Sequence, residues 1–315
     1  MRQMHGSEEK VRVAVVGVGH LGQHHARIYT ELPGVELVAV VDIAEEPRRQ
    51  VGGTLGVRGL ADYRDLLGKV HAVSVAVPTF HHHAIARDFL LAGSDVLVEK
   101  PITRTLAEAD DLVATAATNG RILQVGHSER YNGAVQALAR EVQDPGFIEV
   151  HRMGPFPGRG TDVDVVLDLM IHDIDIVLTL VKSPVTAVSA VGVPVVSDQV
   201  DIANARIEFA SGCVANLTAS RVSGERLRKI RVFQRDTYFV LDYAAQELHL
   251  YRQSSGAGPE GSRLIRVDIP VARVEPLRQE LSDFVDSVRT RRPPMIAGEA
   301  GREAVAVATR IIERL

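Results

Sequence analysis

Lys100 has the sequence neighbours that chemistry at a hydroxyl group requires. It directly follows the apolar run DVLV and stands between Glu99 and Pro101. The proline restricts the backbone before it, so that a helix does not start there. An ammonium group held at the end of a buried strand can hydrogen-bond a hydroxyl and stabilise the alkoxide that forms as hydride departs. On the sequence alone, the alternative is a Lys–Glu pair at the surface.

A second polar pair interrupts the most apolar helical pattern of the chain, which runs from Asp162 to Val181. A helix that is apolar nearly all round is expected to be buried. Its polar residues recur at spacings of four, four, three and four, and therefore form one narrow stripe: Asp164, Asp168, His172, Asp175 and Thr179. Asp168 and His172 are neighbours on this stripe, and a carboxylate beside an imidazole orients the ring and raises its pKa, as a general base requires. The residues also fit a satisfied buried pair that braces a domain interface.

The elements that would position these groups begin with a glycine motif after the first apolar run. A β-branched run of the kind buried in a parallel sheet precedes the motif G-x-G-x-x-G, which is followed by a helical pattern and then by a second strand that ends on an acid. The successive segments are Val11–Val16, the glycines 17, 19 and 22, residues 20–31, residues 36–41 and Asp42.

Each residue of this unit has a physical role in binding a dinucleotide. Gly17 permits the tight turn out of the strand, Gly19 lets a pyrophosphate approach the backbone, and Gly22 allows close packing of the helix. The phosphates would lie at the N-terminus of the helix, where N–H groups and the positive dipole end point at them. Asp42 would accept hydrogen bonds from the adenosine ribose. The alternative is a glycine-rich structural turn.

Asp42 also indicates which dinucleotide is bound. Its carboxylate would repel a 2′-phosphate, and Ile43 and Ala44 supply no cation. We therefore expect NAD rather than NADP as the cofactor. Arg48 and Arg49 are an exception to this argument, because from the following helix they would reach the ribose and offer a cation to a 2′-phosphate.

Alternation of strands and helices continues to about residue 126 and predicts a doubly wound parallel sheet, whose ligands bind at the carboxyl ends of the strands. Polar residues gather at those ends, in the segments 78–83, 99–101 and 126–132. Three adjacent histidines, at positions 81 to 83, suggest a metal site. Successive helical residues point about 100° apart, however, so we expect no metal there.

From about Val185 the pattern changes to short alternating strands, which predict a large, mainly antiparallel open sheet. We expect an N-terminal Rossmann domain over residues 1–126 and a substrate-binding and oligomerisation α+β domain over residues 127–315. One face of the second sheet would expose apolar side chains unless it is covered, so we expect a homodimer or homotetramer built sheet against sheet. The alternative is a mixed face that water tolerates.

Length and composition exclude several other classes of protein. The 315 residues suffice for two domains, and 45% hydrophobic and 24% charged residues are typical of an ordinary folded protein. The formal net charge of −4 argues against a broad surface for nucleic acid or anionic membranes. Cys213 is the only cysteine, which excludes an intrachain disulfide and a cysteine zinc site. Without a signal-peptide core or a run of ~20 apolar residues, we expect a cytoplasmic protein that acts on a small molecule, with no nucleic-acid or membrane partner.

The segments GVGHLG, VPTFHH and EKP together resemble those of the Gfo/Idh/MocA oxidoreductase family. The resemblance implies that NAD is the cofactor and that Lys100 is the catalytic or substrate-orienting lysine. The D-x-x-x-H helix of the family, which faces the nicotinamide, corresponds to Asp168 and His172. Val77 and Thr79 depart from the family segment T-P-N-x-x-H. The resemblance and the glycine motif place at the cofactor Gly17, Gly19, His20, Leu21, Gly22, Asp42, Pro78, Thr79, His82, Glu99 and Lys100.

Recurring arginines near the predicted cleft favour a phosphorylated substrate, because the guanidinium fork suits phosphate. They are Arg130, Arg152, Arg159, Arg221, Arg226 and Arg228. The segments GHSERYN and GPFPGRGTDVDVVLDLMIHDID resemble a branch of the family that oxidises C3 of a UDP-N-acetylhexosamine with NAD. The residues expected at the substrate are Lys100, Arg130, Tyr131, Asn132, Arg159, Asp168 and His172. Two alternatives are an inositol or free-sugar dehydrogenase and an NAD-binding sensor without turnover.

Overall fold

The computed structural model describes residues 9–156, 164–253 and 264–315. The chain divides into two compact units. Unit 1 contains the chain up to Gly126 together with Leu277–Arg302, and unit 2 contains His127–Pro276 and Glu303–Leu315. The sequence-based division at residue 126 did not include the return of Leu277–Arg302 to unit 1.

Unit 1 is built on a six-stranded parallel sheet in the order β3-β2-β1-β4-β5-β6. Strands β2 and β3 extend the sheet on one side of β1, and strands β4 to β6 extend it on the other. Ligands of such folds bind at this switch point, between β1 and β4. The strands are β1 (Val11–Val16), β2 (Val35–Val41), β3 (Arg58–Leu60), β4 (Ala72–Val75), β5 (Asp95–Glu99) and β6 (Leu123–Gly126). The helices are α1 (Gly22–Glu31), α2 (Glu45–Leu55), α3 (His82–Leu91), α4 (Leu106–Thr118) and α7 (Pro276–Thr290).

Local sequence explains where these elements begin and how they pack. The β-branched residues of β1 are buried, as a strand covered on both faces requires. Helix α4 begins at a capping box in which Thr105 and Glu108 satisfy each other's backbone N–H groups. Phe284, near the middle of α7, packs in the same buried cluster as Val13 and Tyr29. The last part of the chain therefore completes the core of unit 1.

Unit 2 is built on an eight-stranded sheet in the order β14-β13-β12-β11-β7-β10-β9-β8. All neighbouring strands are antiparallel except β7 and β10, which pair in parallel. This confirms the predicted large, mainly antiparallel sheet. The strands are β7 (Phe147–Met153), β8 (Val185–Val193), β9 (Ile202–Phe209), β10 (Val214–Ser220), β11 (Leu227–Gln234), β12 (Thr237–Asp242), β13 (Glu247–Gln253) and β14 (Leu264–Ile269).

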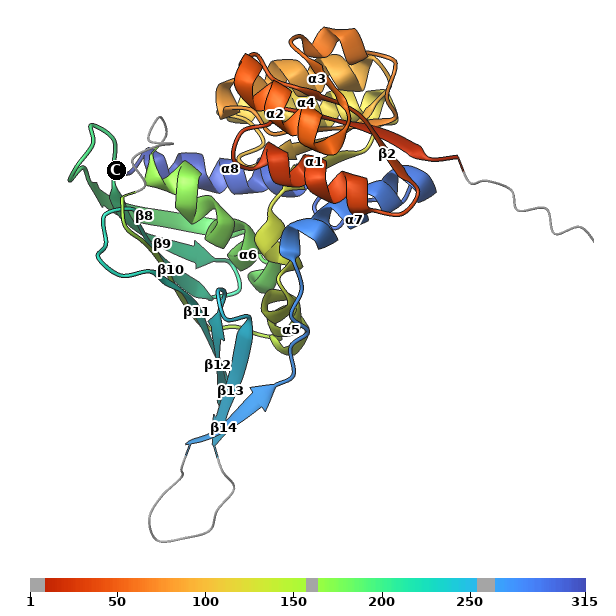
Figure 1. Ribbon diagram of the computed structural model, residues 1–315. Coiled ribbons are helices and arrows are strands. Elements are labelled where there is room, and N and C mark those ends of the chain that lie inside the picture. Colours follow the sequence, from red (N-terminus) through yellow and green to blue (C-terminus); the bar gives the residue numbers. More distant parts are fainter. Residues whose placement is uncertain (1–8, 157–163, 254–263) are drawn as a thin grey trace, which may run out of the picture. The chain divides into compact units, whose positions relative to one another are not determined.

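Helices α5 (Gly133–Glu141) and α6 (Ile171–Val181) lie on one face of this sheet (Figure 1). Alternate residues of each central strand are buried beneath them, such as Ile148 and Val150 of β7. The chain ends with α8 (Gly298–Ile312). Among the residues that the structure describes, no helix combines the length and apolarity needed to cross a membrane.

Two features of unit 2 differ from the sequence prediction. Helix α5 was not predicted, although Asn132 caps it by accepting a hydrogen bond from the N–H of Ala134 at 3.0 Å. The predicted helix of residues 162–181 is irregular, because a π-helical turn at Val166–Met170 precedes α6. An i→i+5 turn inserts one extra residue, so the spacing argument for a single polar stripe fails across it.

Candidate active site

A pocket of about 530 Å³ opens at the carboxyl ends of β1, β2 and β4 in unit 1. The residues around it include Gly17 and Gly19 of the glycine motif, Asp42 and Ile43 after β2, and Pro78 after β4. The pocket therefore lies where the sequence predicted the dinucleotide, and its volume falls within the range of small-molecule sites.

The three glycines of the motif are required for different reasons. Gly17 has a φ of +87°, and a Cβ there would lie 2.5 Å from the carbonyl oxygen of Ala76. A Cβ on Gly22 would lie 1.8 Å from the carbonyl oxygen of Gly17, so that α1 could not approach the turn. A Cβ on Gly19 would meet nothing within 4 Å. Gly19 therefore borders open space, which fits a residue that leaves room for a pyrophosphate.

The carboxylate of Asp42 is held in a fixed orientation by the backbone. Its Oδ2 accepts a hydrogen bond from the N–H of Val18 at 2.9 Å, and its Oδ1 accepts one from the N–H of Ala44 at 2.9 Å. Arg48 donates to the carbonyl oxygen of Asp42 at 2.9 Å, whereas Arg49 pairs with Glu46. The remaining lone pairs of the carboxylate suit ribose hydroxyls, and this cradle together with the open space at Gly19 fits a bound dinucleotide.

Sequence reasoning missed the wall of this pocket that follows β3. Asp62, Tyr63 and Arg64 line it at the start of a short 3₁₀ turn, where the side chain of Asp62 accepts a hydrogen bond from the N–H of Arg64 at 2.9 Å. The guanidinium of Arg64 lies 4.9 Å from the centre of the Tyr63 ring. Burial, together with the hydrogen bond to Asp88, raises the pKa of Tyr63 to about 12. The sequence pattern predicted a weak strand near Val57–Leu60 and a short helix at Asp62–Leu67, but these residues carry no motif that would assign them to a binding site.

Lys100 is positioned by a buried carboxylate rather than by a surface pair. Oε2 of Glu99 accepts a hydrogen bond from the backbone N–H of Lys100 at 3.2 Å, and Oε1 contacts Nε2 of His25 at 3.0 Å. Burial acts to raise the pKa of Glu99, but the hydrogen bond and charge of His25 and the charge of Lys100 outweigh it and lower the pKa. A Cβ on Gly126 would lie 2.9 Å from the carboxyl carbon of Glu99, so the absence of a side chain at Gly126 leaves the space that the carboxylate occupies.

His82 connects the ends of two neighbouring strands instead of standing open in the pocket. Its side chain is buried, with Nδ1 2.9 Å from the carbonyl oxygen of Pro101 and Nε2 2.8 Å from that of Val77. Burial lowers the pKa of His82 despite these hydrogen bonds. The ring therefore links the Pro78–Thr79 turn to the segment of Lys100. The other predicted cofactor residues, His20 and Leu21, are exposed in the glycine turn.

In unit 2, Asp168 lies in the π-helical turn and His172 in the first turn of α6. Both are partly exposed, whereas the flanking residues Met170 and Ile171 are fully buried. The buried ring of His127 stands edge-on to His172, with ring centres 6.2 Å apart and planes at 88°. The two predicted active-site residues of this helix are therefore partly accessible, although most residues of the element are buried.

The other residues of the predicted stripe have partners inside unit 2. Asp175 is buried and forms an ion pair with Arg130 at 3.3 Å, and Thr179 accepts a second hydrogen bond from Arg130 at 2.5 Å. Asp173, which lies off the predicted stripe, forms two hydrogen bonds with Arg152 at 2.8 and 2.9 Å. Arg130 and Arg152 are therefore engaged with carboxylates of α6.

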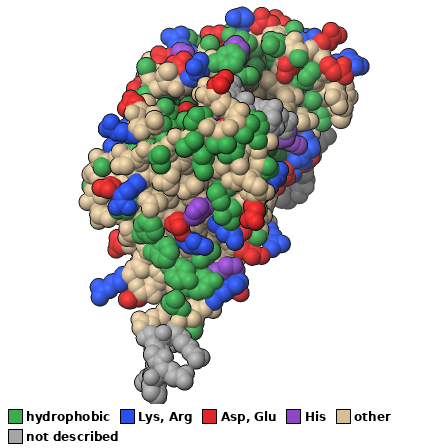
Figure 2. Space-filling view, turned by 90° about the vertical axis from the view of Figure 1, so that its left-hand side faces the viewer, with side chains coloured by type: hydrophobic (Ala, Val, Ile, Leu, Met, Phe, Trp, Pro, Cys, Tyr) green, Lys and Arg blue, Asp and Glu red, His purple; other side chains and the backbone are tan. Residues whose placement is uncertain are grey.

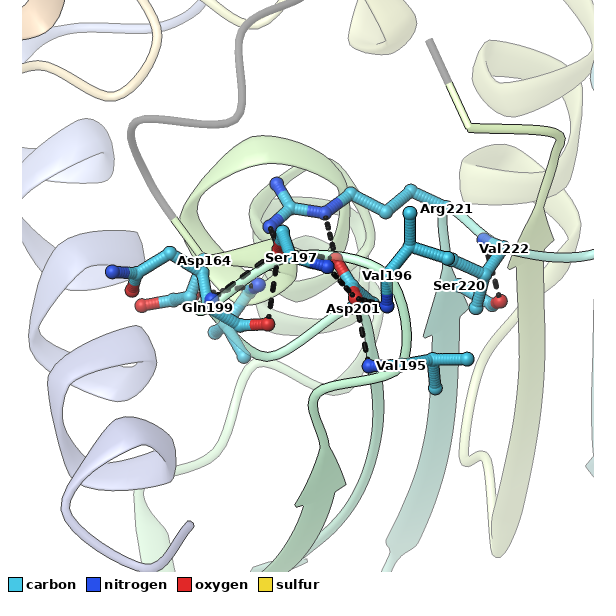
Figure 3. Close-up of polar contacts among 10 residues, drawn as sticks. Asp164, Val195, Val196, Ser197, Gln199, Asp201, Ser220, Arg221 and Val222 are labelled. Carbon is cyan, nitrogen blue, oxygen red and sulfur yellow. Dashed lines mark hydrogen bonds and ion pairs between the residues drawn. The ribbon is translucent and has the colours of Figure 1, made fainter. Parts of the chain in front are cut away.

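A third arginine, Arg221, is also held inside unit 2 (Figure 3). It is almost completely buried and donates to Asp201 at 2.9 Å. Burial acts to raise the pKa of Asp201, but hydrogen bonds from the N–H groups of residues 195–197 and from the Ser197 hydroxyl lower it well below its usual range. This carboxylate fixes the loop whose Val200 accepts a hydrogen bond from Val165 at the start of the π-helical segment.

The remaining predicted substrate residues have varied surroundings. Tyr131 and Asn132 are each 2% exposed, and Asn132 caps α5 and donates to the carbonyl oxygen of Tyr243 at 3.0 Å. Arg226 and Arg228 are exposed at the start of β11. Arg159 lies outside the described residues. Within residues 9–156, 164–253 and 264–315, no group of three or more His, Cys, Asp or Glu side chains is arranged to hold a metal ion.

The first unit thus contains a pocket whose glycine turn and fixed carboxylate fit a dinucleotide, and together with the family comparison this defines the class of the protein as an NAD-binding oxidoreductase of Rossmann type. Comparison with family models agrees: residues 11–127 match the oxidoreductase family with an NAD-binding Rossmann fold, and residues 150–237 match the GFO/IDH/MocA C-terminal domain. The chain belongs to the Gfo/Idh/MocA oxidoreductase family.

Individual relatives are similar over nearly the whole chain. UDP-N-acetylglucosamine 3-dehydrogenase from Acidithiobacillus ferrooxidans is 38% identical over 96% of this chain and 96% of its own. A solved structure of that enzyme aligns with a TM-score of 0.91 at 36% identity, covering 96% of this chain and 97% of that chain. The scyllo-inositol 2-dehydrogenase (NAD(+)) of Bacillus subtilis is 29% identical over 92% of this chain and 89% of its own.

Proposed function

We propose that the protein oxidises a ring hydroxyl of a nucleotide sugar to a ketone, at C3 of a UDP-N-acetylhexosamine. The observation that supports this most directly is the 38% identity, over 96% of both chains, to a UDP-N-acetylglucosamine 3-dehydrogenase. In this proposal unit 1 binds NAD, and unit 2 supplies substrate-binding side chains and the surface for oligomerisation.

The proposed chemistry assigns distinct roles to three side chains. NAD, when bound, supplies the hydride acceptor. His172 takes the proton of the reacting hydroxyl, and Asp168 orients its ring. Lys100 donates a hydrogen bond to the same oxygen and stabilises the negative charge that develops on it. The position of Lys100 depends on Glu99, whose carboxylate accepts the Lys100 backbone N–H at 3.2 Å.

The proposal is tested with a panel of UDP-sugars and NAD, followed by absorbance at 340 nm. Replacing Lys100 with Met or His172 with Asn is expected to lower kcat at least 100-fold, the scale of general acid–base catalysis, while NAD affinity stays within a few-fold. Lys69→Met and His151→Asn are matched controls in the same two units and are expected to retain activity. Near-normal rates for both Lys100→Met and His172→Asn would refute the mechanism.

A second candidate substrate is inositol or a free sugar. It is favoured by the engagement of Arg130, Arg152 and Arg221 with carboxylates inside unit 2, which weakens the argument that these arginines bind a phosphate. Arg159→Ala separates the candidates, because a large loss of activity with a UDP-sugar supports the nucleotide, whereas activity on myo-inositol that is independent of Arg159 supports the second candidate. A flat trace with every sugar would indicate an NAD-binding sensor instead.

The fixed carboxylate of Asp42 supports a preference for NAD over NADP. Both of its oxygens accept backbone N–H groups, so the charge stays where a 2′-phosphate would have to lie. Equal or better turnover with NADP would contradict this preference. In that case Arg48 and Arg64, which lie beside Asp42 and on the pocket wall, would be the cations to test by substitution.

The open face of the eight-stranded sheet supports the proposal of a homo-oligomer. A row of aromatic rings crosses four strands on this face, with ring centres 4.6 to 5.8 Å apart: Phe147, Phe233, Tyr238 and Tyr251. Val191 of the edge strand β8 is 61% exposed. Figure 2, which views the side on the left of Figure 1, shows hydrophobic side chains gathered between scattered charges. Light scattering at the monomer mass would refute the proposal.

A further inference from the structure

Unit 1 has a second pocket, of about 620 Å³, at the opposite edge of its sheet from the dinucleotide pocket. It lies where β1 and β5 begin and beside the residues that precede β4 and β6, so it is formed at the amino ends of the parallel strands. Basic side chains from distant parts of the chain meet there: Lys10, Arg12, His71, Arg121, Arg289 and Arg291. Neither the cofactor nor the proposed chemistry uses this pocket.

The charge of this pocket is only partly balanced. Five Lys and Arg side chains line it against two carboxylates, those of Glu9 and Asp95, which leaves a formal excess of three positive charges. The carboxylate of Asp95 is buried and already forms an ion pair with Arg291. In a concave surface an excess of one sign of charge raises the local concentration of ions of the opposite sign.

Backbone carbonyl groups hold the guanidinium groups of Arg121 and Arg289 in place, and Arg289 also forms an ion pair with Asp286 at 3.8 Å. Arg121 donates to the carbonyl oxygens of Asn119 at 3.1 Å and Gly93 at 2.9 Å, and Arg289 donates to that of Pro33 at 2.7 Å. Nη2 of Arg12 lies 3.2 Å from Nε2 of His71. Within the described part of the chain, neither Arg12 nor Arg121 forms an ion pair with a carboxylate.

These two arginines therefore present fixed, positively charged forks with unused N–H donors. A planar guanidinium binds two oxygens of one phosphate at once, and several such forks around one cavity suit a ligand with adjacent phosphates. A cavity of about 620 Å³ is large enough for a nucleoside diphosphate as well as for free diphosphate. We propose that this pocket binds a diphosphate group, separately from the dinucleotide pocket.

The test is calorimetric titration of the NAD-saturated full chain with inorganic pyrophosphate, with UDP and with uridine, at about 0.1 M salt. Saturation with NAD removes the glycine motif as a competing site for phosphates. We expect pyrophosphate and UDP to bind and uridine not to bind. Because UDP can also bind at the proposed substrate site, only UDP binding that Arg12→Gln weakens is assigned to this pocket. Tighter binding of UDP than of pyrophosphate by that measure would identify a nucleotide as the ligand, and equal or tighter binding of pyrophosphate would identify the free anion.

Variants assign the binding to the pocket. Arg12→Gln and Arg121→Gln are each expected to weaken pyrophosphate binding at least tenfold, with unchanged NAD affinity. Arg235→Gln is the matched control, because it removes one positive charge from a side chain that is 96% exposed in unit 2. Arg121 also donates to two loop carbonyl oxygens, so Arg121→Gln can impair folding. In that case Arg12→Gln alone still tests the proposal. Unchanged pyrophosphate binding in Arg12→Gln, or no binding to the NAD-saturated protein, would overturn the proposal.

Discussion

The glycine motif allows NAD binding and folding to be perturbed separately. A methyl group on Gly19 would meet nothing within 4 Å, so Gly19→Ala should change the free energy of unfolding by less than about 0.5 kcal/mol. A methyl group on Gly22 would lie 1.8 Å from the carbonyl oxygen of Gly17, which is backbone that cannot step aside. Gly22→Ala should therefore cost at least about 2 to 3 kcal/mol, the upper range for overpacking, because the helix propensity of alanine returns at most about 1 kcal/mol.

NAD binding should respond differently from folding. In Gly19→Ala the methyl group would occupy the space that we assign to the pyrophosphate, so we expect the Kd for NAD to rise at least tenfold, about 1.4 kcal/mol. Urea unfolding without NAD measures stability, and the shift in Tm upon adding NAD measures binding. Wild-type protein at 100 times Kd should gain about 2.7 kcal/mol from NAD. Equal NAD-induced shifts in wild type and Gly19→Ala would refute this reading of the motif.

Further predictions concern the buried charges. Arg152→Met leaves Asp173 as an unpaired buried charge and should destabilise unit 2 by about 3 to 5 kcal/mol in urea; a second change, Asp173→Leu, should restore part of this loss, and no recovery would contradict the explanation. The pKa of Asp201 lies below its ordinary value of 3.8, so its contribution to stability is present above about pH 4 and is lost as the pH falls further. Asp201→Asn should therefore lower stability at neutral pH and flatten its decline in acid, as followed by Tm from pH 3 to 7. Glu99→Gln should lower kcat more than it changes the Kd for NAD, because the carboxylate positions the backbone of Lys100.

The sequence predicted the features that arise from local pattern. Gly17, Gly19 and Gly22 act within one turn and its helix, so their spacing was sufficient to predict the cradle. The position of Lys100 followed from the buried strand before it. The doubly wound sheet and the large, mainly antiparallel sheet were likewise predicted, because alternation and strand length are local properties of the chain.

Features that depend on distant residues were not predicted. Glu99 and His25 are 74 positions apart, and Asp201 and Arg221 are 20 apart, so no pattern pairs them in advance. The π-helical turn before α6 adds a residue that a periodicity of 3.6 cannot reveal. Asp175 was predicted on the same polar stripe as His172, and its partner, Arg130, lies 45 positions away in the sequence.

The return of α7 to unit 1 has a consequence for how the protein is made. Leu281, Phe284 and Val285 belong to the buried cluster that surrounds β1 and α1. A ribosome that has released only the first 126 residues has therefore produced a nucleotide-binding half with an open hydrophobic gap. That half can close only after α7 has been translated, although the strands of its own sheet precede the whole of the second sheet in the chain. During this interval the nascent chain is exposed to chaperones and to aggregation.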